Sequence, residues 1–303
     1  MGLGIASVQN ILELYNLGYL KNSKSIIEMG SQELHLKKED LKQLFNNASL
    51  KDDLIDKIPN IKNWPFSPRS SSKYLYNSLG VEEYQCIDIG GQHNAICHDL
   101  NKPFEDKSKF NKFDVVTDLG ACDCAFNVGE CYKTMHKLTK PGGYIIIQQG
   151  VLKAFRYYLF DKSIFEGMAA ANNYKIIFIS YIITTGTKTE NGSYHQFHIP
   201  ANRSLFNTLD FARLENIGIH VVFQKQNGDE FKVPDSYYYS VKENYNFAGF
   251  NRMYFKDPLS YSYIPSATLT LEKAPVVLII KALFKCFIKK IKRIIRIIIM
   301  KTK

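Results

Sequence analysis

The stretch Tyr84-Gln-Cys-Ile-Asp88 is a short apolar run that ends on an aspartate, directly before Ile89-Gly90-Gly91. A second run of the same kind, Phe113-Asp-Val-Val-Thr-Asp118, ends before Leu119-Gly120. Runs of this length that stop at glycine are typical of strands covered on both faces. Because open α/β sheets bind their ligands beyond the carboxyl ends of parallel strands, the two aspartates predict a ligand-binding edge.

The segments around these two runs continue the pattern. A weaker apolar run, Ala95-Ile-Cys-His98, ends on Asp99. After the second run, one segment of helical length leads to Lys140-Pro-Gly-Gly143 and to the apolar run Tyr144-Ile-Ile-Ile147. Hydrophobic periodicity assigns the remaining segments. It predicts helices over 7–20, 37–58, 73–79, 127–138, 163–172 and 204–215, strands over 23–30, 174–183 and 218–224, and a polar loop over 186–200.

Strands that alternate with helices predict an α/β fold with a doubly wound, mostly parallel sheet and right-handed crossovers. At 303 residues the chain can bury a full core of this kind and still carry appended segments. We expect one domain over residues 1–232. An irregular, tyrosine-rich segment over 233–274 and a basic amphipathic helix over 275–303 would follow it.

The net charge of +10 is located in the last part of the chain. Nine of the 39 lysines and arginines follow Pro275, where no acid occurs, so the rest of the chain has 30 basic and 29 acidic side chains. A nearly neutral body argues against a broad nucleic-acid-binding face, so no nucleic-acid partner is expected.

The cysteines predict neither disulfides nor a metal site. Cys122-Asp-Cys124 lies near Cys131 and His136, but a zinc site usually needs a second closely spaced cysteine pair. A chance cluster is therefore favoured, and no metal is expected. The first residues lack the basic start of a secretory signal, and Ala6 departs from the myristoylation pattern. These features predict a reduced, cytoplasmic protein.

Five segments, taken in order, resemble a class I S-adenosylmethionine-dependent methyltransferase domain, a Rossmann-like fold. Within it the chain is similar to methyltransferase-like proteins encoded with bacterial surface-polysaccharide enzymes. The first loop departs from the family's glycine-rich pattern because Gly30 is its only glycine, and the interval from Gly30 to Asp88 is unusually long. The segments are Ile26-Ile-Glu-Met-Gly30-Ser-Gln, Tyr84–Asp88, Asp99-Leu-Asn-Lys-Pro-Phe104, Phe113–Gly120 and Lys140–Gly143.

The resemblance implies S-adenosyl-L-methionine as cofactor and a set of residues that hold it. Asp88 would accept both ribose hydroxyls, and Asp99 and Leu100 would form the adenine pocket. The complete implied set is Glu28, Gly30, Ser31, Asp88, Ile89, Asp99, Leu100, Asp118, Leu119 and Gly120.

Each role has a structural alternative. Asp88 could instead cap the Gly90-Gly91 turn, and Asp99 could begin a turn before Pro103. Glu28 and Gly30 would line the methionine end of the cofactor, or simply form a strand-to-helix turn. Asp118 could bind the positively charged methionine end, orient an acceptor hydroxyl as a catalytic residue, or cap a helix.

His195 and His198 lie in the predicted polar loop. A neutral imidazole there could remove a proton from an acceptor hydroxyl, so His195 is a candidate catalytic base. The alternative is a solvated loop histidine. His136, on the predicted 127–138 helix, is expected to be structural.

Basic residues recur every three or four positions after Pro275, and isoleucine, leucine and phenylalanine fill the rest of the helix circumference. The charges interrupt any long apolar run, which argues against a spanning helix. A wide apolar face with a cationic stripe favours a helix that lies on an anionic membrane surface through residues 276–300. Alternatively, this helix could dock on the rest of the protein or on a partner protein, or it could be a hydrophobic C-terminal segment without a specific binding role.

The combined prediction is a peripheral membrane methyltransferase that methylates an oxygen of a sugar or lipid-linked glycan. The alternative is a non-catalytic module that keeps the fold as a scaffold at the membrane. A nicotinamide oxidoreductase is disfavoured because no Gly-x-Gly-x-x-Gly follows any predicted strand.

Overall fold

The structure is a computed structural model of the chain. It describes residues 2–51, 55–59, 69–154, 156–201, 206, 209 and 214–234. The chain divides into a large unit, residues 1–207 and 211–263, and a small one, residues 208–210 and 264–303. All of the small unit except Leu209 falls outside the described residues, as do most of the tyrosine-rich segment and the whole basic helix expected over 275–303.

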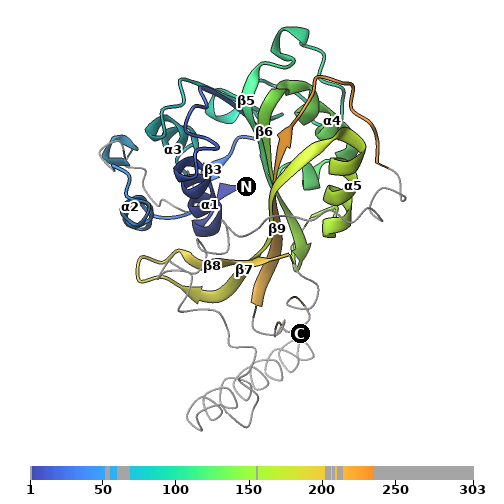
Figure 1. The fold of residues 1–303 in the computed structure, drawn as a ribbon. Helices are drawn as coiled ribbons and strands as arrows, with labels where there is room; N and C mark the ends of the chain where they lie inside the picture. The colour runs from blue at the N-terminus through green and yellow to red at the C-terminus, as the bar shows by residue number, and fades with distance from the viewer. Residues whose placement is uncertain are drawn as a thin grey trace, which may run out of the picture. The chain divides into compact units, whose positions relative to one another are not determined.

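The large unit is built on a seven-stranded sheet in the order β4-β2-β5-β6-β9-β7-β8 (Figure 1). Strands β4, β2, β5 and β6 are mutually parallel. Strand β9 pairs antiparallel with both β6 and β7, so β7 runs in the direction of β6, and β8 returns antiparallel to β7. The strands are β2 (Ser25–Met29), β4 (Glu83–Ile87), β5 (Phe113–Leu119), β6 (Thr139–Leu152), β7 (Tyr174–Lys188), β8 (Tyr194–Pro200) and β9 (Leu214–Lys225).

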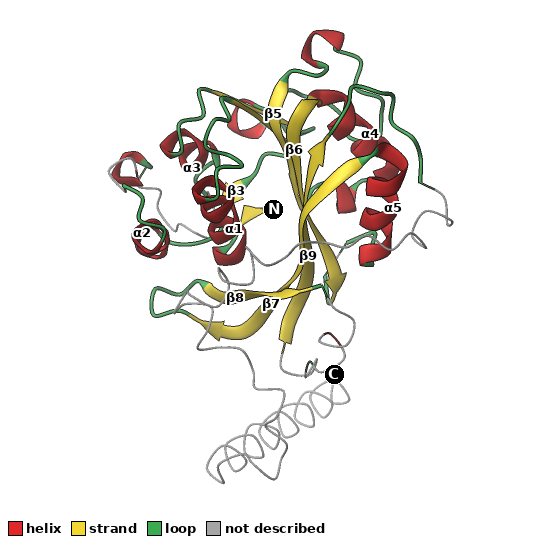
Figure 2. Ribbon diagram, viewed as in Figure 1, coloured by secondary structure: helices red, strands yellow, loops and turns green. Residues whose placement is uncertain are grey.

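Helices cover the sheet on both sides, as Figure 2 shows. A two-stranded sheet of β1 and β3 lies near the N-terminus. The N-terminal helices α1 to α3 lie on one side of the sheet, and α4 and α5 lie on the other. The remaining elements are β1 (Gly2–Leu3), α1 (Ile5–Asn16), β3 (Glu33–Leu34), α2 (Lys38–Asn47), α3 (Lys73–Ser78), α4 (Val128–Leu138) and α5 (Lys162–Asn172), with short 3₁₀ turns at Ile55–Lys57, Gln92–Asn94, Lys107–Lys109 and Cys122–Cys124.

The core explains why the short runs become strands. Ile26, Ile27, Val115, Val116 and Ile146 are all almost completely buried, so both faces of β2, β5 and β6 are covered. Burying apolar surface of this kind is the main stabilising contribution to a fold. The α/β prediction is therefore confirmed, with the correction that the sheet is mixed because its second half is antiparallel.

Polar contacts attach α1 to the second half of the sheet. The Ser7 hydroxyl donates to Gln148 on β6, and Asn10 Nδ2 lies 2.8 Å from His220 Nε2 on β9. His198 Nε2 on β8 donates to the carbonyl oxygen of Ala6, at 2.8 Å. These partners lie on one face of the sheet, so α1 is fixed over β6, β9 and β8.

The predicted loop over 186–200 is wrong. Strand β7 continues to Lys188, and β8 pairs with it from Tyr194 to Pro200, so the polar residues form a hairpin. Threonines and tyrosines in this segment favour a strand, and their polarity hid that signal. His195 and His198 are strand residues with 5% and 4% of their surface exposed.

Smaller differences between the predicted and the observed elements concern where single helices and strands begin and end. The helix predicted over 37–58 ends at Asn47, and Ser49 has φ 57°, which interrupts the helical path. The weak run at 95–98 forms no strand and makes one isolated parallel bridge, Ile87 with Ile96. Most of the predicted 204–215 helix lies outside the described residues, and β9 begins at Leu214. Within the part of the chain that is described, no helix is long and apolar enough to cross a membrane.

Candidate functional site

The topology places a ligand edge where the strand order reverses. From β2 the chain crosses to β4 on one side and then to β5 on the other. In open α/β sheets, a reversal of this kind opens a crevice outside the carboxyl ends of the two strands. We call this region the switch-point edge: the carboxyl ends of β2, β4 and β5 with the residues that directly follow them.

Asp88 follows β4 and is held by backbone donors. Its Oδ2 accepts from the amide of Ser31, at 2.9 Å, and its Oδ1 accepts from the amide of Gly90, at 2.7 Å. Ser31 in turn donates its hydroxyl to the carbonyl of Gln92, at 2.8 Å. The side chain of Asp88 is partly exposed. A carboxylate offers about four lone-pair sites, so two remain for a ligand at this edge.

Gly30 closes β2 in a conformation that only glycine adopts easily. Its φ is +81°, and a Cβ there would lie 2.8 Å from the Cβ of Ala121. The backbone after β2 therefore packs directly against the turn after β5. This close approach needs a single glycine, which accounts for the sparse first loop of the sequence.

Asp118, at the end of β5, is a structural anchor in this structure. Its Oδ1 accepts from the amides of Ala121 and Cys122, at 2.9 and 3.0 Å, and its Oδ2 accepts from the Gln149 side chain. The carboxyl group is completely buried, and burial raises its pKa to about 6 against the opposing effect of the two amides. This geometry matches the alternative interpretation of Asp118, in which its carboxylate caps a turn of helix and does not contact a ligand.

The other predicted cofactor residues lie around the same edge. Asp99 accepts from the amide and side chain of Asn101, at 3.0 and 2.9 Å, and these bonds lower the pKa of its carboxyl group. Asn101 also accepts from the amide of Asn127 at the start of α4, at 2.9 Å. Asp99 thus forms the turn that the alternative interpretation described. Leu119 is buried, Gly120 has φ +86°, and Ile89 exposes 74% of its surface.

Glu28 does not present its carboxylate to the edge. It is completely buried under the N-terminal helices and accepts from the hydroxyls of Ser72, Tyr84 and Thr117, at 2.5, 2.7 and 3.1 Å. Burial raises the pKa of its carboxyl group, although these hydroxyls oppose the shift. Glu28 was expected to line the methionine end of the cofactor, and the structure corrects this expectation. Its buried carboxylate instead connects β2 with β4, β5 and the start of α3 through hydrogen bonds.

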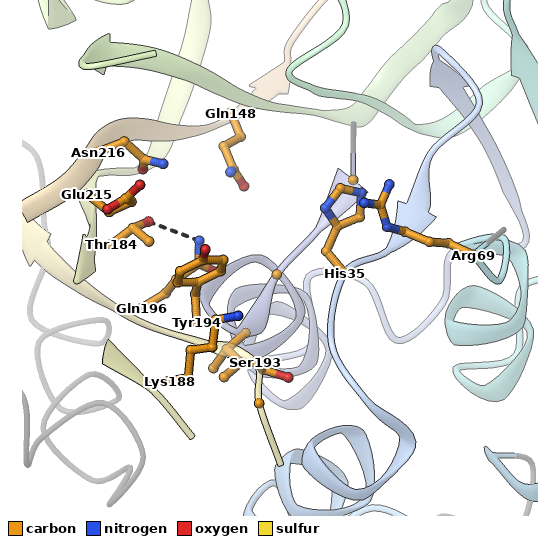
Figure 3. A pocket seen from close by; sticks show the side chains of 14 residues that line it. His35, Arg69, Gln148, Thr184, Lys188, Ser193, Tyr194, Gln196, Glu215 and Asn216 are labelled. Atoms are coloured by element: carbon orange, nitrogen blue, oxygen red, sulfur yellow. Dashed lines mark hydrogen bonds between the residues drawn. The ribbon is translucent and has the colours of Figure 1, made fainter. Parts of the chain in front are cut away.

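A polar cavity of about 340 Å³ is lined by Gln148, which pairs with Leu119 at the end of β5. Its lining comes from the carboxyl ends of β6 and β7, the beginnings of β8 and β9, and the start of α1. We call it the polar cavity. Figure 3 shows Gln148, Asn216, Glu215, Thr184 and Gln196 on one side and His35 and Arg69 on the other.

Hydrogen bonds hold the walls of the polar cavity together. Gln196 Nε2 donates to the Thr184 hydroxyl, at 3.1 Å, and Gln196 Oε1 accepts from the amide of Ala6, at 3.4 Å. Lys188 Nζ lies 4.8 Å from the ring centroid of Tyr194. Arg69 Nη1 lies 3.2 Å from Glu33 Oε2. The exposed walls therefore offer amides, hydroxyls and charged groups of both signs.

A buried acid fixes the hairpin that forms one wall. Asp40 of α2 is completely buried and accepts from the side chains of Ser193, Asn191 and Thr189. The Asn191 bond is 2.8 Å. Since the hairpin tip is tied to the N-terminal helices, β8 keeps a defined place at the cavity.

The structure does not bring His195 to the polar cavity. Tyr194 and Gln196 line the cavity, and successive strand residues point to opposite faces. His195 therefore faces the other side of β8. The prediction that a loop carries this imidazole to an acceptor is corrected, and His195 is replaced as base candidate by groups that do line the cavity.

Sequence reasoning missed most of the polar cavity. Gln148 and Gln149 end the apolar run of β6, as the aspartates end β4 and β5, so this polar strand end was a usable signal. His35, Arg69 and Asn216 come from distant segments, and no local pattern connects them. Among the residues that the structure describes, no group of three or more histidine, cysteine or acidic side chains could hold a metal ion. Cys122 is buried and Cys124 is exposed.

Residues 94–192 match a family model described as a methyltransferase domain. This region contains β5, α4, β6, α5, β7 and part of the switch-point edge. No curated protein matches the chain. The match covers less than half of the chain and supports a methyltransferase domain in that part of it.

Among solved structures, the chain is distantly similar to several methyltransferases. A putative methyltransferase of Bacillus halodurans has 11% identity, covers 72% of this chain and 99% of its own, and has a TM-score of 0.38. A SAM-dependent methyltransferase of Archaeoglobus fulgidus has 10% identity, covers 72% and 93%, and has a TM-score of 0.38. The 1,6-didemethyltoxoflavin-N1-methyltransferase of Burkholderia thailandensis, with bound S-adenosylhomocysteine, has 8% identity, covers 73% and 79%, and has a TM-score of 0.35. These low values assign no substrate to the chain.

Proposed function

We propose that the protein binds S-adenosyl-L-methionine at the switch-point edge and methylates a hydroxyl oxygen of a sugar or lipid-linked glycan held in the polar cavity. The observation that carries this proposal is the position of Asp88: a partly exposed carboxylate, fixed by the amides of Ser31 and Gly90, at the strand reversal.

The residues at the switch-point edge fit the proposed cofactor. Asp88 keeps acceptor capacity for two ribose hydroxyls, and Gly30 lets the loop after β2 pack against Ala121 and turn beside Asp88. Ile89, at 74% exposure, offers an apolar surface beside them for the adenine ring. The cofactor carries no pyrophosphate, so the glycine-rich turn of dinucleotide sites is not required. When bound, S-adenosylmethionine supplies an activated methyl group.

The chemistry of the polar cavity favours a hydroxyl-rich acceptor. Gln148, Gln196 and Asn216 carry amides that both donate and accept, and Thr184 and Tyr194 add hydroxyls. A cavity of this kind can hold a sugar ring by directed hydrogen bonds. Because methyl transfer is an in-line displacement, the main task of these side chains is to align the acceptor oxygen and to exclude water.

A hydroxyl acceptor must lose its proton, and two lining groups could take it. His35 and Glu215 are the histidine and acidic side chains among the described residues that line the polar cavity. An imidazole is suited to this task because its ordinary pKa lies near neutral pH. We propose His35 as the base, with His35→Asn expected to lower kcat and to remove the acidic limb of the pH–rate profile.

The membrane part of the proposal rests on the sequence of residues 276–300, which lie outside the described residues. A helix with an apolar face and nine basic residues nearby would hold the enzyme on an anionic membrane surface, where lipid-linked surface-polysaccharide precursors are made. Deleting residues 276–303 should abolish flotation with anionic vesicles and leave cofactor affinity unchanged. Unchanged flotation would reject the anchor.

Calorimetry with S-adenosylmethionine tests the core of the proposal. Wild-type protein should bind, and Asp88→Ala should weaken binding about 100-fold because two hydrogen bonds to a charged group are lost. Asp106→Ala is the matched control, because Asp106 is an acid that likewise accepts from a backbone amide two residues later, that of Ser108. It should bind like wild type.

The other outcomes separate the alternatives. No heat with wild-type protein would contradict the proposal and favour the non-catalytic scaffold, and preferential binding of NAD would favour an oxidoreductase. Radiolabelled methyl transfer to a panel of free sugars, nucleotide sugars and amines would then identify the acceptor class. Transfer to amines alone would replace oxygen by nitrogen as the methylated atom.

A further inference from the structure

A second cavity, which we call the side cavity, lies beside edge strand β4. Its volume is about 410 Å³, and its lining includes Tyr84, Gln85 and Cys86 from the middle of edge strand β4 and Ser71, Lys73 and Tyr74 around the start of α3. Neither the proposed cofactor residues nor most of the polar cavity contributes to it. Arg69 is the exception, because it lines both cavities.

The lining of the side cavity is cationic. It contains Arg69, Lys73 and His93, and no aspartate or glutamate occurs among the described residues that line it. The Arg69 guanidinium and the His93 imidazole lie 3.2 and 3.4 Å from Glu33, which fixes both side chains from outside the cavity. The two permanent cations, Arg69 and Lys73, outnumber the single carboxylate of Glu33, and this net positive charge favours an anionic ligand.

A buried hydroxyl in the same wall has no internal partner. Ser70 exposes 1% of its surface, and its Oγ has no hydrogen-bond partner among the described residues. An unsatisfied buried hydroxyl is costly for a folded protein and is uncommon without a functional reason. Ser70 follows Arg69 in the chain and is among the residues that line the cavity, so we infer that an oxyanion bound there accepts from its hydroxyl.

We propose that the side cavity binds a small phosphorylated molecule, with the phosphate between Arg69, Lys73 and Ser70. Phosphate oxygens accept from a guanidinium, an ammonium and a hydroxyl at the same time. The cavity is larger than a phosphate ion and falls in the size range of small-ligand sites, and Tyr74 and Tyr84 provide a wall for an attached organic group. This binding site goes beyond the proposed methyl transfer and does not depend on it.

Phosphorus NMR titration and thermal melting test the proposal on the full chain. The probes are inorganic phosphate and glucose 6-phosphate, with glucose as the unphosphorylated control. Wild-type protein should bind glucose 6-phosphate with millimolar or better affinity and melt at a higher temperature in its presence. Inorganic phosphate should compete, and S-adenosylmethionine, which carries no phosphate, should not.

Three variants locate the site. Lys73→Gln and Ser70→Ala should each weaken binding about fivefold or more, because each removes one donor to the phosphate. Lys175→Gln removes an exposed lysine of β7 that lines neither cavity, and it should bind like wild type. Ser70→Ala should not lower the melting temperature without ligand, because the hydroxyl has no internal bond to lose.

Several results would overturn the proposal. These are the absence of saturable binding, equal binding by Lys73→Gln, Ser70→Ala and wild type, and equal binding of glucose. A lower melting temperature of ligand-free Ser70→Ala would also overturn it, because the hydroxyl would then be structural. If inorganic phosphate bound as tightly as glucose 6-phosphate, the ligand would be the phosphate ion, and the proposal of an attached organic group would be wrong. Failure of S-adenosylmethionine to bind would leave these results unaffected, so the two proposals fail separately.

Discussion

The switch-point edge and the polar cavity lie side by side on one sheet but are built differently. At the switch-point edge, Asp88 and Asp118 accept from backbone amides a few residues later in the chain, and Asp88 accepts in addition from the amide of Ser31, 57 residues earlier. At the polar cavity, side chains from α1, β6, β7, β8 and β9 meet through contacts between distant segments, such as Ser7 with Gln148. Local bonds can be found in a sequence, whereas contacts over such separations need the fold.

The comparison also predicts different consequences of mutation. Acidic residues near the carboxyl ends of the strands connect several strands and turns, so replacing them should lower the free energy of unfolding. Residues of the β7–β8 hairpin position only one wall of the polar cavity, so replacing them should change the dynamics of the hairpin alone.

The largest effect is expected at Glu28. Glu28→Ala removes the acceptor of three hydroxyl groups and leaves a void under α3, so the free energy of unfolding should fall by about 3 kcal/mol. Urea unfolding measures this loss. Glu82→Ala is the control, because Glu82 forms an ion pair with Lys24 and has 72% of its side chain exposed, and it should cost less than about 0.5 kcal/mol. Equal losses would refute the internal role of Glu28.

Gly30→Ala should destabilise more than Gly80→Ala. Both glycines have positive φ, +81° and +87°, so both substitutions pay about 1 kcal/mol of backbone strain. Only at Gly30 would the new Cβ meet a neighbour, Ala121 Cβ at 2.8 Å, and this should add about 1–3 kcal/mol. The difference between the two unfolding curves isolates the close approach. A difference near zero would mean that β2 and the turn after β5 can move apart.

The pKa of Asp118 predicts a pH dependence of stability. Its folded value, about 6, lies above its ordinary value of 3.8, so the protonated form is favoured in the folded state. Its contribution is present below pH 4 and is lost as the pH rises through 6, amounting to about 3 kcal/mol. Asp118→Asn should remove this loss, because an amide stays neutral.

Activity separates this structural role from a catalytic one. Asp118→Asn can keep the bonds from the amides of Ala121 and Cys122, so methyl transfer should stay within about threefold of wild type. If a folded Asp118→Asn variant lost several orders of magnitude of methyl-transfer activity, Asp118 would again be a candidate catalytic residue.

The smallest effect is expected at the hairpin. Asn191→Ala removes one of the bonds to Asp40, so the amides of residues 189–193 should exchange hydrogen about fivefold faster. Glu190→Ala, an exposed neighbour in the same turn, should leave exchange unchanged. Hydrogen-exchange mass spectrometry would measure both variants. Faster exchange at residues 29–32 as well would show that the cavity wall and the switch-point edge are coupled.

Particular residues show how far sequence reasoning reached. The strands ending at Asp88 and Asp118, and the helices at 73–78, 128–138 and 162–172, follow from periodicity, glycine and proline. The place of Asp88 at an edge was predictable because the period of a strand and its terminating turn are local properties. The hairpin over 186–200 was not, because its polar side chains are buried by partners far along the chain, such as Asp40.

The sequence by itself determined the order of the parallel strands and the helices between them, the ends of these strands and the single glycine after β2. Only the tertiary structure decided that Glu28 and Asp118 turn inward, that His195 faces away from the polar cavity, and that Arg69 lines two cavities. The physical reason is that a backbone pattern follows from neighbouring residues. The direction and bonding of a buried polar side chain depend on which distant donors the packing brings within about 3 Å.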